Sequence, residues 1–257
     1  MVLPTIKLGL SEVTRLIVGG NPFSGFSHQS SANSREMVDY YTMERILAVL
    51  RDCQKAGINA FLGRGDNFIT RVLNEHWNGD GSLQWIGQTA SERANVQADI
   101  RMMAAYHPIA IYHHGARTDR LFQQGHMDEV LDYVRYIQDL GFPAGVGTHN
   151  PAVMEWIEGA GWELDFYLLS FYNLSGTGGD IYLPADREAA CRTIQAVDKP
   201  VLAVKVLAAG RNDPREAISY AFSHIKPQDA IVVGFYPKHH PCQVFEMVAL
   251  VEEALAS

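Results

Sequence analysis

The 257-residue chain contains few cysteines, no long hydrophobic run and no stretch of clustered basic residues. Its three cysteines, Cys53, Cys191 and Cys242, are far apart and form no CxxC pair, which argues against a disulfide framework and a thiolate metal site. No window approaches the roughly 18 consecutive apolar residues of a membrane span, and the opening MVLPTIKLGL lacks the pattern of a secretory signal. We therefore expect a cytoplasmic protein that does not bind a membrane.

Positive charge is also scarce. The 29 acidic side chains outnumber the 21 lysines and arginines, which gives a formal net charge of −8 at pH 7. A protein that binds nucleic acid needs basic groups to neutralise phosphates, and no run of Lys or Arg supplies them here. We expect a small-molecule substrate and no nucleic acid partner, and the sequence leaves the oligomeric state open.

What the chain does have is a regular alternation of strand and helix signals. Short apolar runs rich in β-branched and aromatic residues alternate with longer segments of helical period, and this pair occurs eight times. Such repetition is typical of βα units in a parallel sheet, and a (β/α)8 barrel has about 250 residues. We predict one α/β domain, residues 1–257, folded as a (β/α)8 (TIM) barrel.

The predicted strands are Arg15–Gly19, Ala60–Gly63, Leu83–Gly87, Ile109–His113, Gly145–Thr148, Phe166–Phe171, Val201–Val206 and Ile231–Phe235. The predicted helices lie near Thr42–Ala56, Ile69–Trp77, Glu92–His107, Met127–Leu140, Ala152–Gly159, Arg187–Val197, Arg215–His224 and Cys242–Ala256. The least regular segments, Asn21–Tyr41 and Ser175–Ala185, follow predicted strands. Loops in that position build the active site of such a barrel.

Several segments carry a family pattern in addition to the periodicity. From Ile109 to Asn173 the chain reads IAIYHHG, GVGTHNP and LLSFYN in order, after the opening IKLGLSEVTRLIVGGNPF and before KPVLAVKVLAAGR and DAIVVGFYPKHHPCQVFEMVALV. These segments resemble, in turn, strands four to six, the entry hairpin and first strand, strand seven and strand eight of the aldo-keto reductases. The resemblance implies the same barrel and, in ordinary members, carbonyl reduction by NADPH with a catalytic Asp, Tyr, Lys and His.

The catalytic positions of that family are largely changed in this chain. Leu62 stands where the resemblance places the Asp, and residues 66–68 offer no phenol where the Tyr is expected. Gly87-Gln88-Thr89 replaces the segment that ends in the Lys. The histidine is kept, as His114 or its neighbour His113 before Gly115. The resemblance is therefore to a divergent member that lacks most of the catalytic tetrad.

Cofactor binding is left open by the same comparison. Where the family reads QxxEN near its last helix, this chain keeps Gln243 and Glu246 and has Met247 in place of the Asn. NADP, if bound, would be held by Lys238, Gln243 and Glu246.

A divalent metal is a second open possibility. His114, His149 and Asp66, or the pair in PKHHP, His239 and His240, could supply the nitrogen and oxygen ligands of Zn²⁺ or Fe²⁺. No HxH, HxxxH or HExxH spacing occurs, so the metal and cofactor stay unknown.

Polar residues at the predicted strand ends define the candidate site, because these ends meet at one mouth when a barrel closes. The candidate catalytic residues are His114, Lys205, Asp66 and His149. The candidate substrate-binding residues are Asn21, Arg64, Gln88, Asn173 and Tyr236.

Each catalytic candidate has a structural alternative. Neighbouring strand residues point to opposite faces, so only one of His113 and His114 faces the mouth, and the family pattern favours His114. His149 precedes a helix start and could be a cap or a loop residue, and Asp66 could cap the helix near Ile69. Lys205 lies in the apolar stretch VLAVKVLA, where an unpaired charge is unfavourable, so it must face the mouth or have a partner.

Three functions fit these residues. We favour a barrel enzyme that uses acid and base groups on a small carbonyl- or sugar-like metabolite, in an elimination, isomerisation or hydrolysis. The alternatives are an NADP-dependent oxidoreductase with a rearranged site and a catalytically inactive barrel that binds a metabolite.

Overall fold

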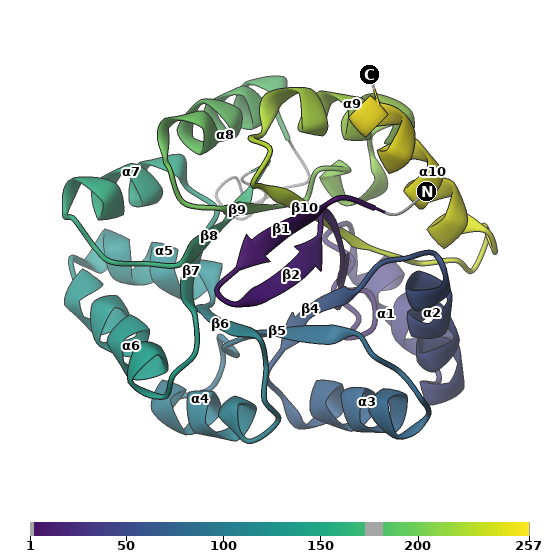
Figure 1. Ribbon diagram of the computed structural model, residues 1–257, viewed down its shortest axis with the longest axis horizontal. Coiled ribbons are helices and arrows are strands. Elements are labelled where there is room, and N and C mark those ends of the chain that lie inside the picture. The colour runs from purple at the N-terminus through teal and green to yellow at the C-terminus, as the bar shows by residue number, and fades with distance from the viewer. Residues whose placement is uncertain (1–2, 173–181, 257) are drawn as a thin grey trace.

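The computed structural model describes residues 3–172 and 182–256 (Figure 1). Eight parallel strands close into a barrel in the order β10-β3-β4-β5-β6-β7-β8-β9, and helices surround it. The predicted (β/α)8 fold is confirmed. The barrel strands are β3 (Leu16–Gly19), β4 (Ala60–Arg64), β5 (Gln84–Gln88), β6 (Ala110–His113), β7 (Ala144–Thr148), β8 (Phe166–Ser170), β9 (Val201–Val204) and β10 (Ala230–Gly234).

Within the described residues, the outer layer contains the eight helices that the sequence predicts and two further ones. Glycines with positive φ, such as Gly57 (+90°) and Gly141 (+84°), follow the ends of helices. The helices are α1 (Ser31–Tyr40), α2 (Met43–Lys55), α3 (Asn67–Asn78), α4 (Val96–Ala104), α5 (Gly115–Gln124), α6 (Met127–Asp139), α7 (Pro151–Gly159), α8 (Pro184–Ala196), α9 (Pro214–His224) and α10 (Gln243–Ala256), with a short 3-10 turn, η1 (Ala208–Gly210).

The two helices missing from the prediction, α1 and α5, bury few residues. Helix α1 buries none of its residues, and α5 buries only Gly115, Thr118 and Leu121. Neither helix therefore contributes much to the core that the apolar pattern of the sequence predicts. The predicted helix Glu92–His107 also begins later, at Val96, because Asn95 is its N-cap. The predicted loop Ser175–Ala185 lies largely outside the described residues.

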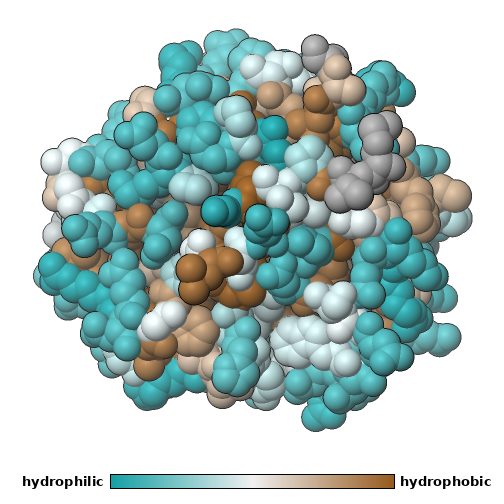
Figure 2. All heavy atoms as spheres, in the orientation of Figure 1, coloured by the Kyte–Doolittle hydropathy of each residue, from teal (hydrophilic) through white to brown (hydrophobic). Residues whose placement is uncertain are grey.

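A hairpin closes the N-terminal end of the barrel. Strands β1 (Thr5–Leu8) and β2 (Ser11–Thr14) pair antiparallel across the centre of the ring in Figure 1. The Asn59 side chain accepts a 2.8 Å hydrogen bond from the Thr14 backbone N–H, and Gln84 donates to the Glu12 carbonyl at 2.9 Å. Figure 2 shows this end as a mostly hydrophilic surface with scattered hydrophobic residues. The barrel interior is therefore approached from the opposite end.

Apolar side chains fill the interior. Ile86 pairs in register with Leu62 on one side and Ala110 on the other, and all three belong to one buried cluster. Tyr112 and Phe166 pack in the same cluster with their rings 6.3 Å apart. The packed interior leaves no room for a ligand, so the C-terminal rim, where barrels of this kind carry their active sites, is the candidate location.

The strands' other faces pack against the helices in a larger core. Along β4 and β5, Phe61 and Trp85 point outward into this core while Leu62 and Ile86 point inward, as the two-residue period of a strand requires. Across the described helices, none is both long enough and apolar enough to span a lipid bilayer.

Candidate active site

His114 lies on the rim at the start of α5. Its Nδ1 accepts a 3.1 Å hydrogen bond from the Ala116 backbone N–H, so it is the N-cap of the helix. A neutral imidazole that accepts at Nδ1 carries its proton on Nε2. Burial, followed by the charges of His149 and Arg64, lowers the pKa of His114 to about 4. At neutral pH His114 is therefore an uncharged ring with one N–H to donate.

His113, its neighbour, faces the helices. The side chain is fully buried, its Nδ1 lies 2.8 Å from Thr118 Oγ1, and its ring stacks on Tyr133 of α6 at 5.4 Å. Burial lowers the pKa of His113 to about 3. The geometry places His114, not His113, at the rim.

Close packing around Gly115 explains why a glycine follows His114 in the sequence. A Cβ atom at this position would lie 3.2 Å from His149 Cε1 and 3.2 Å from the Thr148 backbone nitrogen. Glycine lets the first turn of α5 approach β7 this closely without displacing its neighbours. The close approach brings His114 and His149 together.

His149 is held by a carboxylate that the sequence did not single out. Its Nδ1 lies 2.8 Å from Asp119 Oδ2, and its backbone N–H donates to the same oxygen at 3.1 Å. The Thr148 hydroxyl donates to the other carboxylate oxygen. Since a carboxylate only accepts, the neutral ring carries its proton on Nδ1 and keeps a lone pair on Nε2.

The sequence allowed His149 to be the N-cap of the following helix, but the neighbouring Asn150 has this role. Asn150 Oδ1 accepts from the Ala152 backbone N–H and is the N-cap of α7. His149 is therefore free of that structural role, and its polar contacts in the described chain are those to Asp119.

Lys205 follows β9 directly, because the strand ends at Val204 rather than at the predicted Val206. Its φ of +59° is in the left-handed region, which costs a residue with a side chain about 1–3 kcal/mol. Within the described residues the partly buried amine has neither a hydrogen bond nor an ion pair. Burial lowers the pKa of Lys205 to about 8, and the charge of Asp119 opposes this shift.

The loop after β3 crosses the rim and meets the loop after β9. Asn21 Nδ2 lies 3.0 Å from His28 Nε2, Gln29 donates to the Ala209 carbonyl, and Arg211 donates to the His28 carbonyl at 3.2 Å. Although much of its ring is exposed, His28 has a pKa lowered to about 4 by the protein packed around it. The charges of Lys205, His149, Arg211 and His114 lower that pKa further.

We call His28, His114, Asp119, His149 and Lys205 the rim cluster, because His149 is bonded to Asp119 and the charges of the other three act on this pair or on one another. Sequence reasoning found His114, His149 and Lys205, left His28 open and missed Asp119. Asp119 lies inside α5, a helix that the sequence did not predict, and its partner is thirty positions away. No local pattern could have identified it.

Asp66 is occupied by structural contacts. One of its oxygens accepts from the Ile69 backbone N–H at 2.8 Å, which makes it the N-cap of α3, and the other lies 3.1 Å from Arg64 Nε. Arg64 also pairs with Glu92 and lies 5.1 Å from the centre of the Phe26 ring. Asp66 therefore has the capping role that the sequence allowed as its alternative, and its side-chain contacts are to α3 and Arg64 rather than to the rim cluster.

Gln88 lies at the end of β5 and donates a 2.6 Å hydrogen bond to the Tyr112 hydroxyl. Burial raises the pKa of this phenol far above its usual value. The amide nitrogen of Gln88 therefore already has a partner below the rim. Asn173, another candidate substrate-binding residue, lies outside the described residues.

Tyr236 and the candidate cofactor residues lie against α1 and α10. The Tyr236 ring packs 5.3 Å from that of Tyr40, and its backbone N–H donates to Gln243 Oε1 at 2.7 Å. Lys238 pairs with Glu36 of α1. Tyr236 is thus placed in an aromatic cluster rather than among the rim residues described above.

The same contacts disfavour a cofactor site at these positions. Lys238 and Gln243 already have protein partners, and Met247 is buried where the family pattern has an Asn. NADP binding at these positions would require Lys238 and Gln243 to exchange those partners for the cofactor.

No group of three metal-binding side chains occurs in the described part of the chain. Asp66 is paired with Arg64, and His239 lies 3.5 Å from Glu36, so the metal sets considered from the sequence are not assembled.

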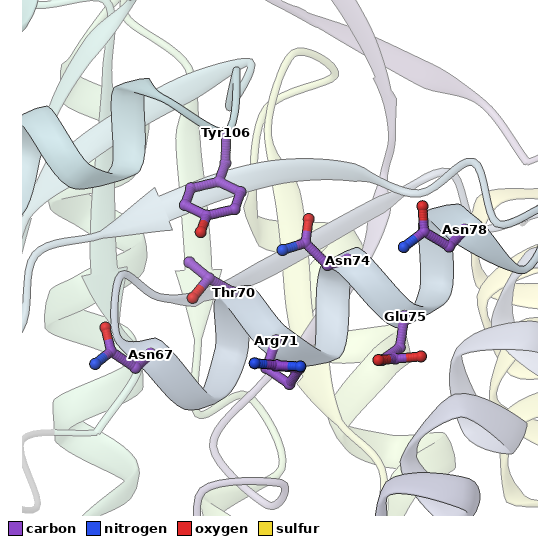
Figure 3. A pocket seen from close by; sticks show the side chains of 7 residues that line it. All are labelled: Asn67, Thr70, Arg71, Asn74, Glu75, Asn78 and Tyr106. Atoms are coloured by element: carbon purple, nitrogen blue, oxygen red, sulfur yellow. The ribbon is translucent and has the colours of Figure 1, made fainter.

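A cavity of about 610 Å³ lies elsewhere, along the outer side of α3. Figure 3 shows its polar side chains on successive turns of the helix, with the ring of Tyr106 pointing toward them. None of the predicted site residues lines it. Its lining residues are Asn67, Thr70, Arg71, Asn74, Glu75, Asn78 and Tyr106.

The fold is similar to several solved structures. A proposed aldo-keto reductase from Pseudomonas aeruginosa matches with a TM-score of 0.67 at 15% identity, over 98% of this chain and 94% of that one. A glycerol dehydrogenase from Gluconobacter oxydans matches with a TM-score of 0.62 at 12% identity, over 98% and 95% of the two chains.

Barrels with other chemistry match as well. An N-acetylmannosamine-6-phosphate 2-epimerase from Clostridium perfringens gives a TM-score of 0.57 at 16% identity, over 90% of this chain and 92% of that one. The sequence matches no protein-family model and no curated protein. At these identities the likeness establishes the barrel, and function must be argued from the rim.

Proposed function

We propose that this protein is an enzyme that moves protons at a carbon next to an oxygen-bearing carbon of a small carbonyl- or sugar-like metabolite. One observation carries the proposal, namely the 2.8 Å contact that holds His149 Nδ1 on Asp119. An imidazole held in this way has a defined lone pair on Nε2 and a carboxylate that stabilises it once it is protonated.

The remaining rim groups have complementary roles. His149 Nε2 removes the proton, and the uncharged His114 donates a hydrogen bond from Nε2 to the substrate oxygen. Lys205, whose charge acts on both His28 and Asp119, draws electrons from the carbon that loses the proton. The Asn21–His28 loop lies across this space and is placed to limit the access of water.

This assignment replaces the reduction that the family resemblance implies. Leu62, where the family has its Asp, is buried in the barrel interior, and Lys238 is paired with Glu36. A rearranged NADP-dependent oxidoreductase is the second candidate, and one observation favours it. The Tyr112 phenol accepts a hydrogen bond from the strand-end residue Gln88 and would have to serve as the proton donor in that reaction.

The test is hydrogen exchange with solvent. Purified protein in D₂O is incubated with aldoses, ketoses and 2-oxo acids, and loss of the proton signal at the carbon next to the carbonyl is followed by NMR. We expect exchange with the wild type, loss of roughly 100- to 10,000-fold in His149→Gln, and no loss in His126→Gln, which changes an exposed histidine just before α6.

NADPH titration on the same sample separates the candidates. Saturable NADPH binding that shifts intrinsic fluorescence and melting temperature, with carbonyl reduction and no exchange, would replace the proposal by the oxidoreductase. Substrate binding with neither reaction would indicate a metabolite-binding barrel.

A further inference from the structure

We propose that Lys205 attacks the carbonyl carbon of the substrate and holds it as a protonated Schiff base while His149 moves the proton. This inference rests on the proposed function, because it places the substrate at the rim cluster. It adds a covalent step and restricts the substrate to aldehydes and ketones.

The position of Lys205 suits a nucleophile. It is the first residue beyond β9, at the rim where the barrel strands end, and it is anchored by a rigid strand on its N-terminal side. The left-handed backbone at this residue turns the chain out of the sheet at that point. A lysine that only stabilised the fold would be expected to pair with a carboxylate.

Among the described residues, Lys205 has no such partner. The nearest acid that acts on it, Asp119, is already bonded to His149 and to the Thr148 hydroxyl. The amine is partly buried, so it faces a region with less water than the surface. These contacts leave the Nζ lone pair available once the amine is deprotonated.

The pKa of Lys205, lowered to about 8 by burial, supports this reading. At pH 7 about a tenth of such an amine is neutral, whereas an ordinary lysine is neutral in about one part in three thousand. Desolvation is a recognised way to activate a lysine for attack on a carbonyl.

The step balances without an oxidant or a reductant. The Nζ lone pair forms a bond to the carbonyl carbon, and the π electrons move to the oxygen. One proton from Nζ and one proton from solvent reach this oxygen, which leaves as water and gives an iminium ion that carries one hydrogen on Nζ. The positive nitrogen acidifies the neighbouring C–H, His149 Nε2 removes that proton, and hydrolysis later returns the amine.

Trapping with sodium borohydride tests the proposal. The reagent reduces a Schiff base to a stable secondary amine. The whole protein is treated with borohydride in the presence of dihydroxyacetone, glyceraldehyde or pyruvate, and its mass is then measured by mass spectrometry. We expect a single adduct that peptide mapping places on Lys205, with a yield that rises between pH 7 and pH 9 as the amine loses its proton.

Three variants make the result decisive. Lys205→Met and Lys205→Arg should lose both the adduct and the hydrogen exchange, and the arginine variant keeps the positive charge if the methionine variant fails to fold. Lys55→Met, which changes an exposed lysine of α2, should keep both. Adducts of equal yield in the wild type and Lys205→Arg would overturn the proposal.

The two proposals fail in different ways. Hydrogen exchange in the wild type without an adduct, and exchange retained in Lys205→Arg, would overturn the Schiff base and leave the acid–base function standing. An adduct on Lys205 without hydrogen exchange would overturn the proton transfer and leave the Schiff base standing.

Discussion

Replacing Asp119 by Asn tests whether this carboxylate makes His149 a base. In the structure Asp119 accepts from His149 Nδ1 at 2.8 Å, from the His149 backbone at 3.1 Å and from the Thr148 hydroxyl. Asparagine has nearly the same size, but it carries no charge and one fewer acceptor. Its amide can also donate to Nδ1, which would move the ring proton to Nε2 and remove the lone pair.

The expected size of the effect follows from the loss of the carboxylate charge and from the change in the His149 tautomer. A hydrogen bond with one charged partner contributes roughly 1.5–3 kcal/mol, which corresponds to a rate change of about 10- to 150-fold. Loss of the correct tautomer adds to this, and removal of a general base lowers rates by roughly 100- to 10,000-fold. We expect Asp119→Asn to slow hydrogen exchange by about 10²- to 10⁴-fold and to lower the free energy of unfolding by about 1–3 kcal/mol.

The assay is the exchange experiment in D₂O, with urea unfolding of the same samples. Asp128→Asn, which removes an exposed carboxylate in the first turn of α6, is the control and should change neither quantity. The reasoning is refuted if Asp119→Asn keeps its rate within about threefold of the wild type while His149→Gln loses it.

Three further predictions concern single contacts. Gly115→Ala should push His149 away from α5 and lower the unfolding free energy by about 1–3 kcal/mol in urea titrations, because its Cβ would meet His149 Cε1 at 3.2 Å; an unchanged midpoint would contradict this. His113 has a pKa lowered to about 3, so its neutral form stabilises the fold fully above pH 6.5, and this stability should be lost as the pH falls from 6.5 toward 3. Unfolding measured across that range should show a loss of several kcal/mol that His113→Gln reduces. Tyr112→Phe should leave the Gln88 amide without its partner and lower the free energy of unfolding by about 1–2 kcal/mol. The variant should keep hydrogen exchange. If it lost an NADPH-dependent reduction that the wild type catalyses, that result would favour the oxidoreductase.

The rim residues show where sequence reasoning succeeds and where it stops. His114 and His149 follow strands directly, so their place at the C-terminal rim could be read from the strand pattern. The partner of His149 could not, because Asp119 lies on a helix whose buried face contains Gly115, Thr118 and Leu121 rather than an apolar stripe. Asp66 looked equally catalytic in the sequence, and only its contacts with Ile69 and Arg64 identify it as a cap.

The sequence by itself determined the barrel. Apolar runs with strand character, helical periods and the glycines that end helices are local signals, and eight repetitions of them leave few other ways to bury a core of this size. The tertiary structure decided which polar groups meet. The contact between His149 and Asp119, and the crossing of the His28 loop to Arg211, join residues 30 and 183 positions apart. Such contacts depend on strand register and barrel closure, which bring distant residues together without any local sequence pattern that would predict the contact.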